Sequence, residues 1–470
     1  MPSHILAIPF PGAGHTINMI NTATALATPS LQVHLLVLSL ATHNRNFASS
    51  GQSPNPNIHL VEIADGQHRA YADEHDPSKL IGFITGADFS GATRKEVEKL
   101  NAGLGNGERV TSALLNPLMG GVIRDLRGME VKVFGLFPSP WYMCRVAMNP
   151  GNVPGANLDT EVDISGVGDV DGELTVMLGD AVDVVTEMYH RFVRPIFDLV
   201  EGWVVSNSNL GLEGHGWRGK VGDESPRNFM VGPMIPDWYL GMAEKGYRKT
   251  MQERAVEVED RDGVLSFVDG LPEKSAVYVA LGSHSDFSKE QALLVIDALR
   301  STETPFVFLH REDPAGLREA VGPDSGGIIT GWAPQLEVLA HPAIKFALSH
   351  GGFGTMMEGI FAGVPFVTCP VGADQFLDTK VMQHLGMLLG TFGVNKRRPR
   401  MAAKDGYPIL PDDNGQTIRN ILGELLGSEE GARRIEVARS KTLEIRKKIL
   451  TSKKEETPAE FEALRSAMSA

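Results

Sequence analysis

Short runs of apolar residues recur along the chain, and each is followed by a longer stretch with a helical pattern. This alternation is typical of a parallel sheet whose strands are joined by helices. Runs in the first half predict strands at residues 5–8, 33–38, 58–63, 131–137 and 203–206. Runs in the second half predict strands at residues 277–281, 306–309, 328–329, 346–348 and 366–368. Two sets of strands predict an α/β protein with two Rossmann-like domains.

The join between the two sets is expected between Gly232 and Gly263, where a proline-rich turn leads into a charged segment. Residues from about 429 onwards have a helical pattern. Residues 151–172 are rich in Gly and Asp without periodicity, which predicts a mobile loop. We expect a first domain at 1–233, a linker at 234–262, a second domain at 263–452 and a C-terminal helix at 453–470.

Length and composition fit this picture, because 470 residues are too many for one comfortable hydrophobic core. A net charge of −14 argues against nucleic acid or an anionic membrane as the main partner. The two cysteines, Cys144 and Cys369, imply no disulfide framework and fit a reducing compartment, so we expect a cytoplasmic protein. The N-terminus lacks the regions of a signal peptide, and no apolar run is long enough to predict a membrane span.

The most distinctive chemistry lies between residues 332 and 375. Trp332 supplies a flat ring that can stack on a base. The run His350-Gly351-Gly352 follows a predicted strand and precedes a predicted helix that carries Thr355 and Glu358. Glycines at such a turn let the backbone approach a ligand, and the N–H groups of a helix start favour an anion. A stacking ring, an anion site and a carboxylate for hydroxyls together predict a nucleotide-sugar site.

This stretch also resembles the donor-binding signature of family 1 UDP-glycosyltransferases. The matching positions are Trp332, Pro334, Gln335, His341, His350, Gly352, Glu358, Gly363, Pro365, Pro370, Asp374 and Gln375. The resemblance implies the GT-B fold, in which two Rossmann-like domains face each other across a cleft and the last helix crosses back to the first domain. It also implies a donor site for a UDP-sugar made by Ser283, Trp332, Ala333, Gln335, His350, Gly352, Gly354, Thr355, Glu358, Asp374 and Gln375.

By the same resemblance, Asp374 and Gln375 hold the hydroxyls of a hexose, and the Gln favours glucose. The chain departs from the plant members of the family at Phe353-Gly354, where they carry Trp-Asn. The glycine removes one amide contact to the phosphates.

The loop after the first strand, residues 9–15, reads Pro-Phe-Pro-Gly-Ala-Gly-His. In an open α/β sheet, ligands bind beyond the carboxyl ends of the strands, and this loop lies there. A histidine at that point has a pKa near working pH and can remove a proton from a hydroxyl. The loop resembles the PFPxxGH pattern of the same family, which implies that His15 is the catalytic base.

Plant members carry an Asp that orients this histidine, at a set distance before the strand end that corresponds to Phe137. The same count in this chain reaches Asn116, and Asp88 or Asp125 are the alternatives. An Asn can accept a hydrogen bond from the ring, but it cannot stabilise the imidazolium as a carboxylate does.

Other cofactor motifs are weak. Gly12-Ala13-Gly14 lacks the third glycine of a dinucleotide-binding loop, since that position is Ile17, and no acidic residue ends the second strand. Asp169-Val170-Asp171 resembles the metal-binding motif of another glycosyltransferase fold but is far in sequence from the nucleotide signature. We therefore expect no metal and no cofactor, with the UDP-sugar, UDP-glucose, as a co-substrate.

The predicted function is inverting transfer of a hexose from a UDP-sugar to a hydroxyl group of a small, largely apolar acceptor. The residues expected to contact the acceptor are Phe10, Trp141, Tyr142 and Met143. The acceptor and the UDP-sugar are the expected partners, and the protein is expected to be a monomer. Two alternatives remain: a non-catalytic nucleotide-sugar-binding protein, and another GT-B enzyme such as a nucleotide-sugar epimerase.

Overall fold

The chain forms two compact units in the computed structural model. Unit 1 contains Met1–Met148, Glu187–Pro236 and Thr451–Ala470, and unit 2 contains Asn149–Thr186 and Asp237–Leu450. The structure describes residues 2–10, 13–37, 40, 43–44, 47, 54–63, 87–105, 107–147, 161–165, 167–169, 174–177, 197, 199–215, 227–253, 258–282, 285–323, 325–372, 374–392 and 413–470. The division assigns residues 149–186 to unit 2, although the sequence placed them within the range of the first domain.

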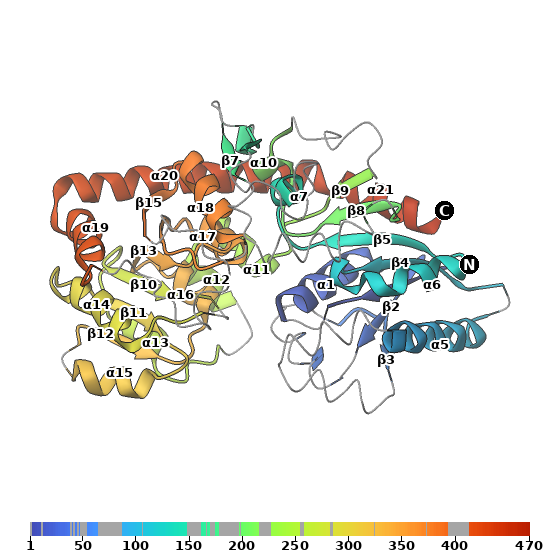
Figure 1. Cartoon of the computed structure of the whole chain (residues 1–470), viewed down its shortest axis with the longest axis horizontal. Helices are drawn as coiled ribbons and strands as arrows, with labels where there is room; N and C mark the ends of the chain where they lie inside the picture. The colour runs from blue at the N-terminus through green and yellow to red at the C-terminus, as the bar shows by residue number, and fades with distance from the viewer. Residues whose placement is uncertain are drawn as a thin grey trace. The chain divides into compact units, whose positions relative to one another are not determined.

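Unit 1 is built on a parallel sheet of seven strands in the order β3-β2-β1-β4-β5-β8-β9 (Figure 1). Its strands are β1 (Ser3–Ile8), β2 (Leu31–Val37), β3 (Ile58–Glu62), β4 (Val110–Leu115), β5 (Lys132–Phe137), β8 (Gly202–Val205) and β9 (Arg227–Met230). The strand order reverses between β1 and β4, which is the point where open parallel sheets bind ligands.

The helices of unit 1 are α1 (Ala13–Leu26), α5 (Ala87–Gly103), η1 (Pro117–Val122), α6 (Ile123–Gly128), α7 (Trp141–Ala147), α10 (Leu210–Glu213) and α21 (Thr457–Ser469). Helix α21 packs against β1, β4 and β9, and its Phe461, Leu464 and Met468 belong to the hydrophobic core of the unit. The Ser112 hydroxyl on β4 donates to the backbone oxygen of Met468 at 2.6 Å. The end of the chain is therefore part of unit 1.

Unit 2 contains a second parallel sheet, with six strands in the order β12-β11-β10-β13-β14-β15 (Figure 1). Its strands are β10 (Ala276–Ala280), β11 (Phe306–Leu309), β12 (Gly327–Thr330), β13 (Ile344–Ser349), β14 (Phe366–Thr368) and β15 (Leu388–Thr391). Every residue of β10 is buried, as expected for a parallel strand covered on both faces. The order of this sheet reverses between β10 and β13.

The helices of unit 2 are α11 (Asp237–Lys245), α12 (Tyr247–Glu253), α13 (Val264–Asp269), α14 (Lys289–Arg300), α15 (Pro314–Val321), α16 (Gln335–Ala340), α17 (Phe353–Ala362), α18 (Gln375–His384), α19 (Gln416–Gly427) and most of α20 (Glu429–Glu455). Helix α14 begins with a side-chain cap, since Ser288 accepts from the N–H of Gln291, and so does α15, since Asp313 accepts from the N–H of Gly316. Such caps satisfy N–H groups that the helix itself leaves unbonded.

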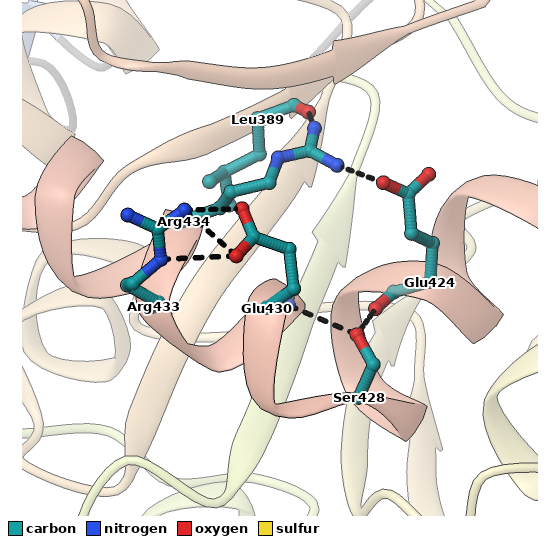
Figure 2. A network of polar contacts seen from close by, with 7 residues as sticks. Leu389, Glu424, Ser428, Glu430, Arg433 and Arg434 are labelled. Carbon is teal, nitrogen blue, oxygen red and sulfur yellow. Dashed lines mark hydrogen bonds and ion pairs between the residues drawn. The ribbon is translucent and has the colours of Figure 1, made fainter.

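Figure 2 shows how α20 is attached to unit 2. The Arg434 guanidinium donates to the backbone oxygen of Leu389 on β15 at 2.8 Å and to the Glu424 carboxylate on α19 at 2.5 Å. Ser428 lies at the corner between the helices, where its Oγ donates to the backbone oxygen of Glu424 at 2.7 Å and accepts from the N–H of Gly431 at 2.9 Å. Arg434 thus connects β15, α19 and α20.

Three strands of the two parallel sheets in the described ranges, β4, β9 and β15, are missing from the sequence-based expectation. The β4 strand contains Thr111 and Ser112, which interrupt its apolar run, and the Ser112 hydroxyl is tolerated in the interior because Met468 accepts its hydrogen bond. The strands β9 and β15 lie at the edges of their sheets, where a continuous apolar run is not required.

Part of the predicted loop 151–172 has regular structure, so the expectation is wrong there. Strand β6 (Glu161–Asp163) pairs antiparallel with β7 (Thr175–Met177), and the short 3-10 helix η2 (Val167–Asp169) lies between them. In β6 only the central Val162 is buried, a pattern too short to recognise in the sequence. Residues 151–160, 166 and 170–172 of the predicted loop, Asp171 among them, lie outside the described residues.

Candidate functional site

The reversal point of the unit 1 sheet brings two polar side chains together. Strands β1 and β4 are parallel neighbours, with Ile8 beside Leu115 at their carboxyl ends. His15 lies in the first turn of α1, shortly after β1, and Asn116 follows β4 directly. The backbone N–H of Asn116 donates to the oxygen of Ile8 at 3.0 Å, which extends the strand pairing by one residue. The sheet topology therefore holds Asn116 beside the start of α1.

Asn116 contacts His15 through its side-chain amide. The Asn116 Nδ2 lies 3.0 Å from His15 Nδ1. The Oδ1 of the same amide accepts from the N–H of Leu118 at 3.1 Å, because Asn116 is the N-cap of η1. The sequence led us to expect the amide oxygen, rather than the nitrogen, next to the ring. The nitrogen faces the ring because the oxygen caps η1.

Phe10 packs its ring edge-on against His15, with the ring centroids 5.2 Å apart and 69° between the planes. The Thr16 hydroxyl donates to the backbone oxygen of Phe10 at 3.0 Å, which fixes the loop against the start of α1. Of the two alternative orienting residues, Asp125 lies on α6, and the side chain of Asp88 lies outside the described part of the chain.

The other three residues expected to contact the acceptor lie in α7 and are buried. Trp141 and Tyr142 are 0% exposed and Met143 is 3% exposed. Glu213, also fully buried, accepts from the backbone N–H groups of Trp141 at 2.7 Å and Tyr142 at 3.1 Å, so it caps the start of α7. Phe10 is partly exposed. The acceptor-binding role of the α7 residues stays a prediction.

In unit 2, a cluster of glycines surrounds His350 at the reversal point of the sheet. Gly282, after β10, and Gly351, after β13, have φ angles of 77° and 79°, which glycine adopts without strain. A Cβ at Gly282 would lie 2.5 Å from His350 Nε2, and a Cβ at Gly352 would lie 2.7 Å from the same atom. These two glycines therefore make room for the imidazole ring. Ser283 lies outside the described residues.

The start of α17 adjoins this histidine. Its N-cap residue, Gly352, makes no side-chain capping bond, and Thr355 in the first turn is 8% exposed. Gly354 is exposed, and a Cβ there would meet no atom within 4 Å. Helix N–H groups without a side-chain cap, next to an imidazole and flanking glycines, are suited to an anion.

Trp332 lies at the surface of unit 2, where its side chain is 38% exposed. The Arg261 guanidinium lies over the indole ring, 5.3 Å from its centroid. Thr330 fixes the backbone, since its Oγ1 is 2.6 Å from the oxygen of Trp332 and accepts from the Trp332 N–H at 3.1 Å. The next residue, Ala333, is buried. An exposed indole on a fixed backbone is suited to stacking on a nucleobase.

Gln335 connects two side chains of the candidate ribose site. Its Nε2 donates to Glu358 Oε2 at 2.5 Å, and its Oε1 accepts from the Tyr278 hydroxyl at 3.1 Å. Burial raises the pKa of Glu358 to about 7, although the hydrogen bond from Gln335 lowers it. Gln335 and Glu358 were expected from the sequence, but Tyr278 was not, because a tyrosine in an apolar strand gives no sign of its partner.

Asp374 and Gln375 lie together at the start of α18. The Gln375 Oε1 accepts from the N–H groups of Val371 at 2.7 Å and Gly372 at 3.0 Å, so a ligand hydroxyl would meet its Nε2. Burial raises the pKa of Asp374 to about 6. A carboxyl and an amide side by side are suited to sugar hydroxyls.

Arg311 is a cation close to Gly282 and His350 that was not expected from the sequence. It follows β11, and its guanidinium donates to the backbone oxygen of Gly282, the glycine that packs against His350. Its own backbone N–H donates to the Asp286 carboxylate at 2.9 Å. No motif marks Arg311, because it reaches Gly282 only through the parallel pairing of β10 and β11.

The described ranges contain no group of three or more His, Cys, Asp and Glu side chains that could hold a metal ion. Their helices also include none with both the length and the hydropathy needed to cross a bilayer. The two cysteines, Cys144 and Cys369, are buried free thiols.

Comparison with known sequences gives matches along the chain. Residues 260–396 match the family model described as UDP-glucoronosyl and UDP-glucosyl transferase. The chain is 24% identical over 456 residues to UDP-glycosyltransferase 74C1 of Arabidopsis thaliana, across 90% of this chain and 93% of that one. It is 31% identical over 159 residues to nuatigenin 3-beta-glucosyltransferase of Solanum aculeatissimum, across 32% of each chain.

Solved structures match over the full length. Medicago truncatula UGT71G1 complexed with UDP-glucose aligns with a TM-score of 0.72 at 18% identity, covering 100% of this chain and 99% of that one. A UDP-glucosyltransferase from Polygonum tinctorium capable of glucosylating indoxyl, in complex with 3,4-dichloroaniline, aligns with a TM-score of 0.69 at 22% identity and the same coverage. At such identities the likeness shows the fold.

Two parallel α/β units that match these structures define the GT-B fold, which confirms the fold class predicted from the sequence. With a family-model match that spans the candidate donor residues, this fold defines a UDP-dependent glycosyltransferase. The comparisons confirm the resemblance to family 1 UDP-glycosyltransferases that the sequence indicated, and the family-model match lies at residues 260–396.

Proposed function

We propose that this enzyme transfers a hexose, glucose, from a UDP-sugar to a small, largely apolar acceptor that carries a hydroxyl group, with inversion at the anomeric carbon. The observation that supports the proposal best is the set of candidate donor residues in unit 2. There, an exposed stacking ring, a partly buried carboxylate and a helix start suited to an anion all follow strands of one parallel sheet. The solved relative from Medicago truncatula is named as a complex with UDP-glucose, which favours glucose as the sugar.

Each part of the donor has a proposed partner. Uracil stacks on Trp332, and the ribose hydroxyls donate to Glu358. The diphosphate binds at the start of α17 and His350, close to the Arg311 guanidinium. In the transition state the departing UDP gains negative charge, and fixed N–H dipoles and cations stabilise that charge without a metal. Asp374 and Gln375 contact the hydroxyls of the hexose by the same proposal.

His15 is the proposed group at the acceptor oxygen. As a general base, it would take the hydroxyl proton at Nε2 while the oxygen attacks the anomeric carbon. The bond from that carbon to the β-phosphate oxygen then breaks, and its electron pair leaves with UDP. Asn116, at 3.0 Å from Nδ1, is the proposed residue that orients the ring.

The direct test is a screen of hydroxyl-bearing acceptors with UDP-glucose, with the products detected by mass spectrometry. We expect glucosides of apolar acceptors. His15→Ala should lower turnover with little change in UDP affinity, because the variant loses only the group at the acceptor. No product from any acceptor would refute the proposal, and UDP binding without transfer would favour the non-catalytic nucleotide-sugar-binding alternative.

A second test asks whether UDP binding needs a divalent metal ion. UDP should stabilise the protein with no divalent ion present, and at a free concentration a hundredfold above Kd the gain is roughly 2.7 kcal/mol. Scanning fluorimetry with and without EDTA measures this. A shift that EDTA abolishes would show that a metal is required. A monomeric state and a cytoplasmic location also stay predictions.

A further inference from the structure

The orientation of the Asn116 amide is fixed by its own cap. Its Oδ1 accepts from the N–H of Leu118 at 3.1 Å, and the side chain is fully buried. Turning the amide over would set its NH2 group against the N–H of Leu118, so that two donors would face each other. The buried amide would then lose its hydrogen bond, which is costly for a buried polar group. The NH2 group therefore points to His15, 3.0 Å from Nδ1.

An amide NH2 group can only donate, so the Nδ1 of His15 must accept. A neutral imidazole with an accepting Nδ1 carries its proton on Nε2. The same arrangement occurs at His341, where Nδ1 accepts from the backbone N–H of Ala343 at 3.1 Å and Nε2 is 3.1 Å from the carboxylate of Asp269. For His15, the Nε2 atom that a general base would use is thus already protonated.

We infer that Asn116 holds His15 in the Nε2–H tautomer, so that His15 serves as a hydrogen-bond donor to an acceptor oxygen that arrives ionised. The preferred acceptors are then carboxylic acids and acidic phenols rather than neutral alcohols. This inference rests on the proposed transfer of glucose from a UDP-sugar and specifies its substrate class. It replaces the proposed removal of a proton by His15 with hydrogen-bond donation from His15.

The reaction with an ionised acceptor balances without a base. A lone pair of the acceptor oxyanion forms the new bond to the anomeric carbon, and the bond from that carbon to UDP breaks with its electrons on the β-phosphate oxygen. The Nε2 proton of His15 stays on the ring throughout. A neutral alcohol, by contrast, must lose a proton that the Nε2–H tautomer cannot take. In triad enzymes, an Asn at the orienting position holds the histidine in the wrong tautomer and lowers turnover about 10⁴-fold.

The tautomer can be measured without any substrate. In the full-length protein labelled with ¹⁵N-histidine, at a pH where the ring is neutral, the ring nitrogen shifts distinguish Nε2–H from Nδ1–H. His15→Gln identifies the His15 signals by their loss, and His341 serves as an internal reference for Nε2–H. We expect Nε2–H for His15 in the wild type and Nδ1–H in Asn116→Asp, whose carboxylate can still cap η1. A wild-type spectrum with Nδ1–H would overturn the inference.

Kinetics with matched acceptors test whether the enzyme prefers an ionised acceptor to a neutral alcohol. Benzoic acid and benzyl alcohol share a ring, but only the acid is ionised near neutral pH, and acceptors found in the screen can be paired in the same way. With the wild type, the acid should react at least about a hundredfold faster, which is the lower range of what a missing base costs. Asn116→Asp should raise kcat for the alcohol about tenfold or more and not for the acid.

Substitutions of His15 separate donation from base catalysis. The Gln amide can donate where Nε2–H does, so His15→Gln should keep transfer to the acid within about tenfold of the wild type, whereas His15→Ala should lose more. Equal losses in the two variants, or a wild type that prefers the alcohol, would overturn the inference. If wild type and Asn116→Asp both bind UDP but neither transfers glucose to any acceptor, the proposed function fails, while the spectrum still decides the tautomer.

Discussion

Gln335 donates a hydrogen bond from Nε2 to the Oε2 of Glu358, over 2.5 Å. The bond joins the start of α16 to the second turn of α17, and these two helices pack on each other. Gln335 favours the ionised carboxylate, because a charged acceptor strengthens the bond, whereas burial opposes the charge. Burial is the larger effect and raises the pKa of Glu358 to about 7. The proposed ribose partner therefore titrates close to neutral pH.

UDP affinity should depend on this titration. Below the pKa, Glu358 is protonated and is a weaker acceptor for the ribose hydroxyls; above it, the carboxylate accepts from them. The ratio of wild-type affinity to that of Glu358→Gln should rise with pH by at most about tenfold per unit up to neutral pH, and then level off. Calorimetry across this pH range measures both affinities. The titration of UDP itself affects both proteins equally, so it does not change their ratio. A ratio that does not vary with pH would contradict the role of Glu358.

Tyr278 should position Gln335 for this site. Tyr278→Phe removes the hydroxyl that donates to Gln335 Oε1 at 3.1 Å, a bond worth roughly 0.5–1.5 kcal/mol. UDP affinity should then fall by about two- to tenfold in calorimetry. Tyr239→Phe is the matched control, since its hydroxyl donates to the backbone oxygen of Glu358 at 2.8 Å and not to Gln335. Equal affinities of the two variants would argue against a positioning role for Tyr278.

The fold was largely predictable because its strands are parallel and buried on both faces. Such strands read as continuous apolar runs, as β10 and β13 do. The β4 strand was missed because Ser112 is acceptable there only through a partner from the far end of the chain, Met468. A contact across 356 positions leaves no trace in a local pattern.

The candidate site was predictable where it depends on short spacing. His350, Gly352 and Glu358 follow one another through a single strand, turn and helix, so their order in sequence fixes their order in space. Arg311 and Tyr278 were missed because they join the site through neighbouring strands. The orientation of the Asn116 amide was also unpredictable, because it depends on the η1 cap.

Substitution of Gly354 by Asn is expected to increase the affinity for UDP-glucose. A Cβ at this exposed position meets no atom within 4 Å, so Gly354→Asn should fold normally. The new amide lies in the first turn of α17, where it could donate to a phosphate, and Asn costs a helix less than Gly does. UDP-glucose should bind more tightly, by about two- to tenfold for one added hydrogen bond. Calorimetry with UDP and with uridine separates a phosphate contact from other effects, because uridine affinity should not change.

Gly359, on the same helix, is the control for backbone effects. A Cβ there would lie 2.1 Å from the Phe366 ring, so Gly359→Ala should lower the melting temperature, whereas Gly354→Asn should not. Destabilisation by Gly354→Asn would contradict the open space at this position. Unchanged UDP-glucose affinity in a folded Gly354→Asn variant would show that the start of α17 does not reach the phosphates.

Trp332 should contribute stacking energy. Stacking of a base on an aromatic ring is worth roughly 1–3 kcal/mol, so Trp332→Ala should weaken UDP binding about five- to 150-fold. Trp332→Phe keeps a smaller ring and should lose less. Because the indole is 38% exposed, the substitutions should have little effect on stability. Calorimetry and thermal unfolding measure the two quantities, and unchanged affinity in Trp332→Ala would place uracil elsewhere.

Three histidines occupy adjacent strands of unit 1: His4 on β1, His34 on β2 and His59 on β3. The His4 Nδ1 lies 2.9 Å from His34 Nε2, and the rings of His34 and His59 stack with their centroids 5.0 Å apart. Burial, followed by the charges of His59 and His4, lowers the pKa of His34 from 6.5 to about 4. Burial also lowers the pKa of His4, although Glu108, 3.6 Å from its Nε2, raises it.

This cluster should make unit 1 sensitive to acid. Between pH 6.5 and about 4, the unfolded chain binds a proton at His34 that the folded unit does not. The contribution of neutral His34 to the stability of unit 1 is therefore fully present above pH 6.5 and is lost as the pH falls through this window. The slope for one proton is at most about 1.4 kcal/mol per pH unit. In His34→Gln, the melting temperature should fall less between pH 6.5 and about 4 than in the wild type. His59→Gln is the control, because His59 is exposed and the variant keeps the other two histidines, so its effect should be smaller. Identical pH profiles for wild type and His34→Gln would show that His34 is protonated in the folded unit as readily as in the unfolded chain.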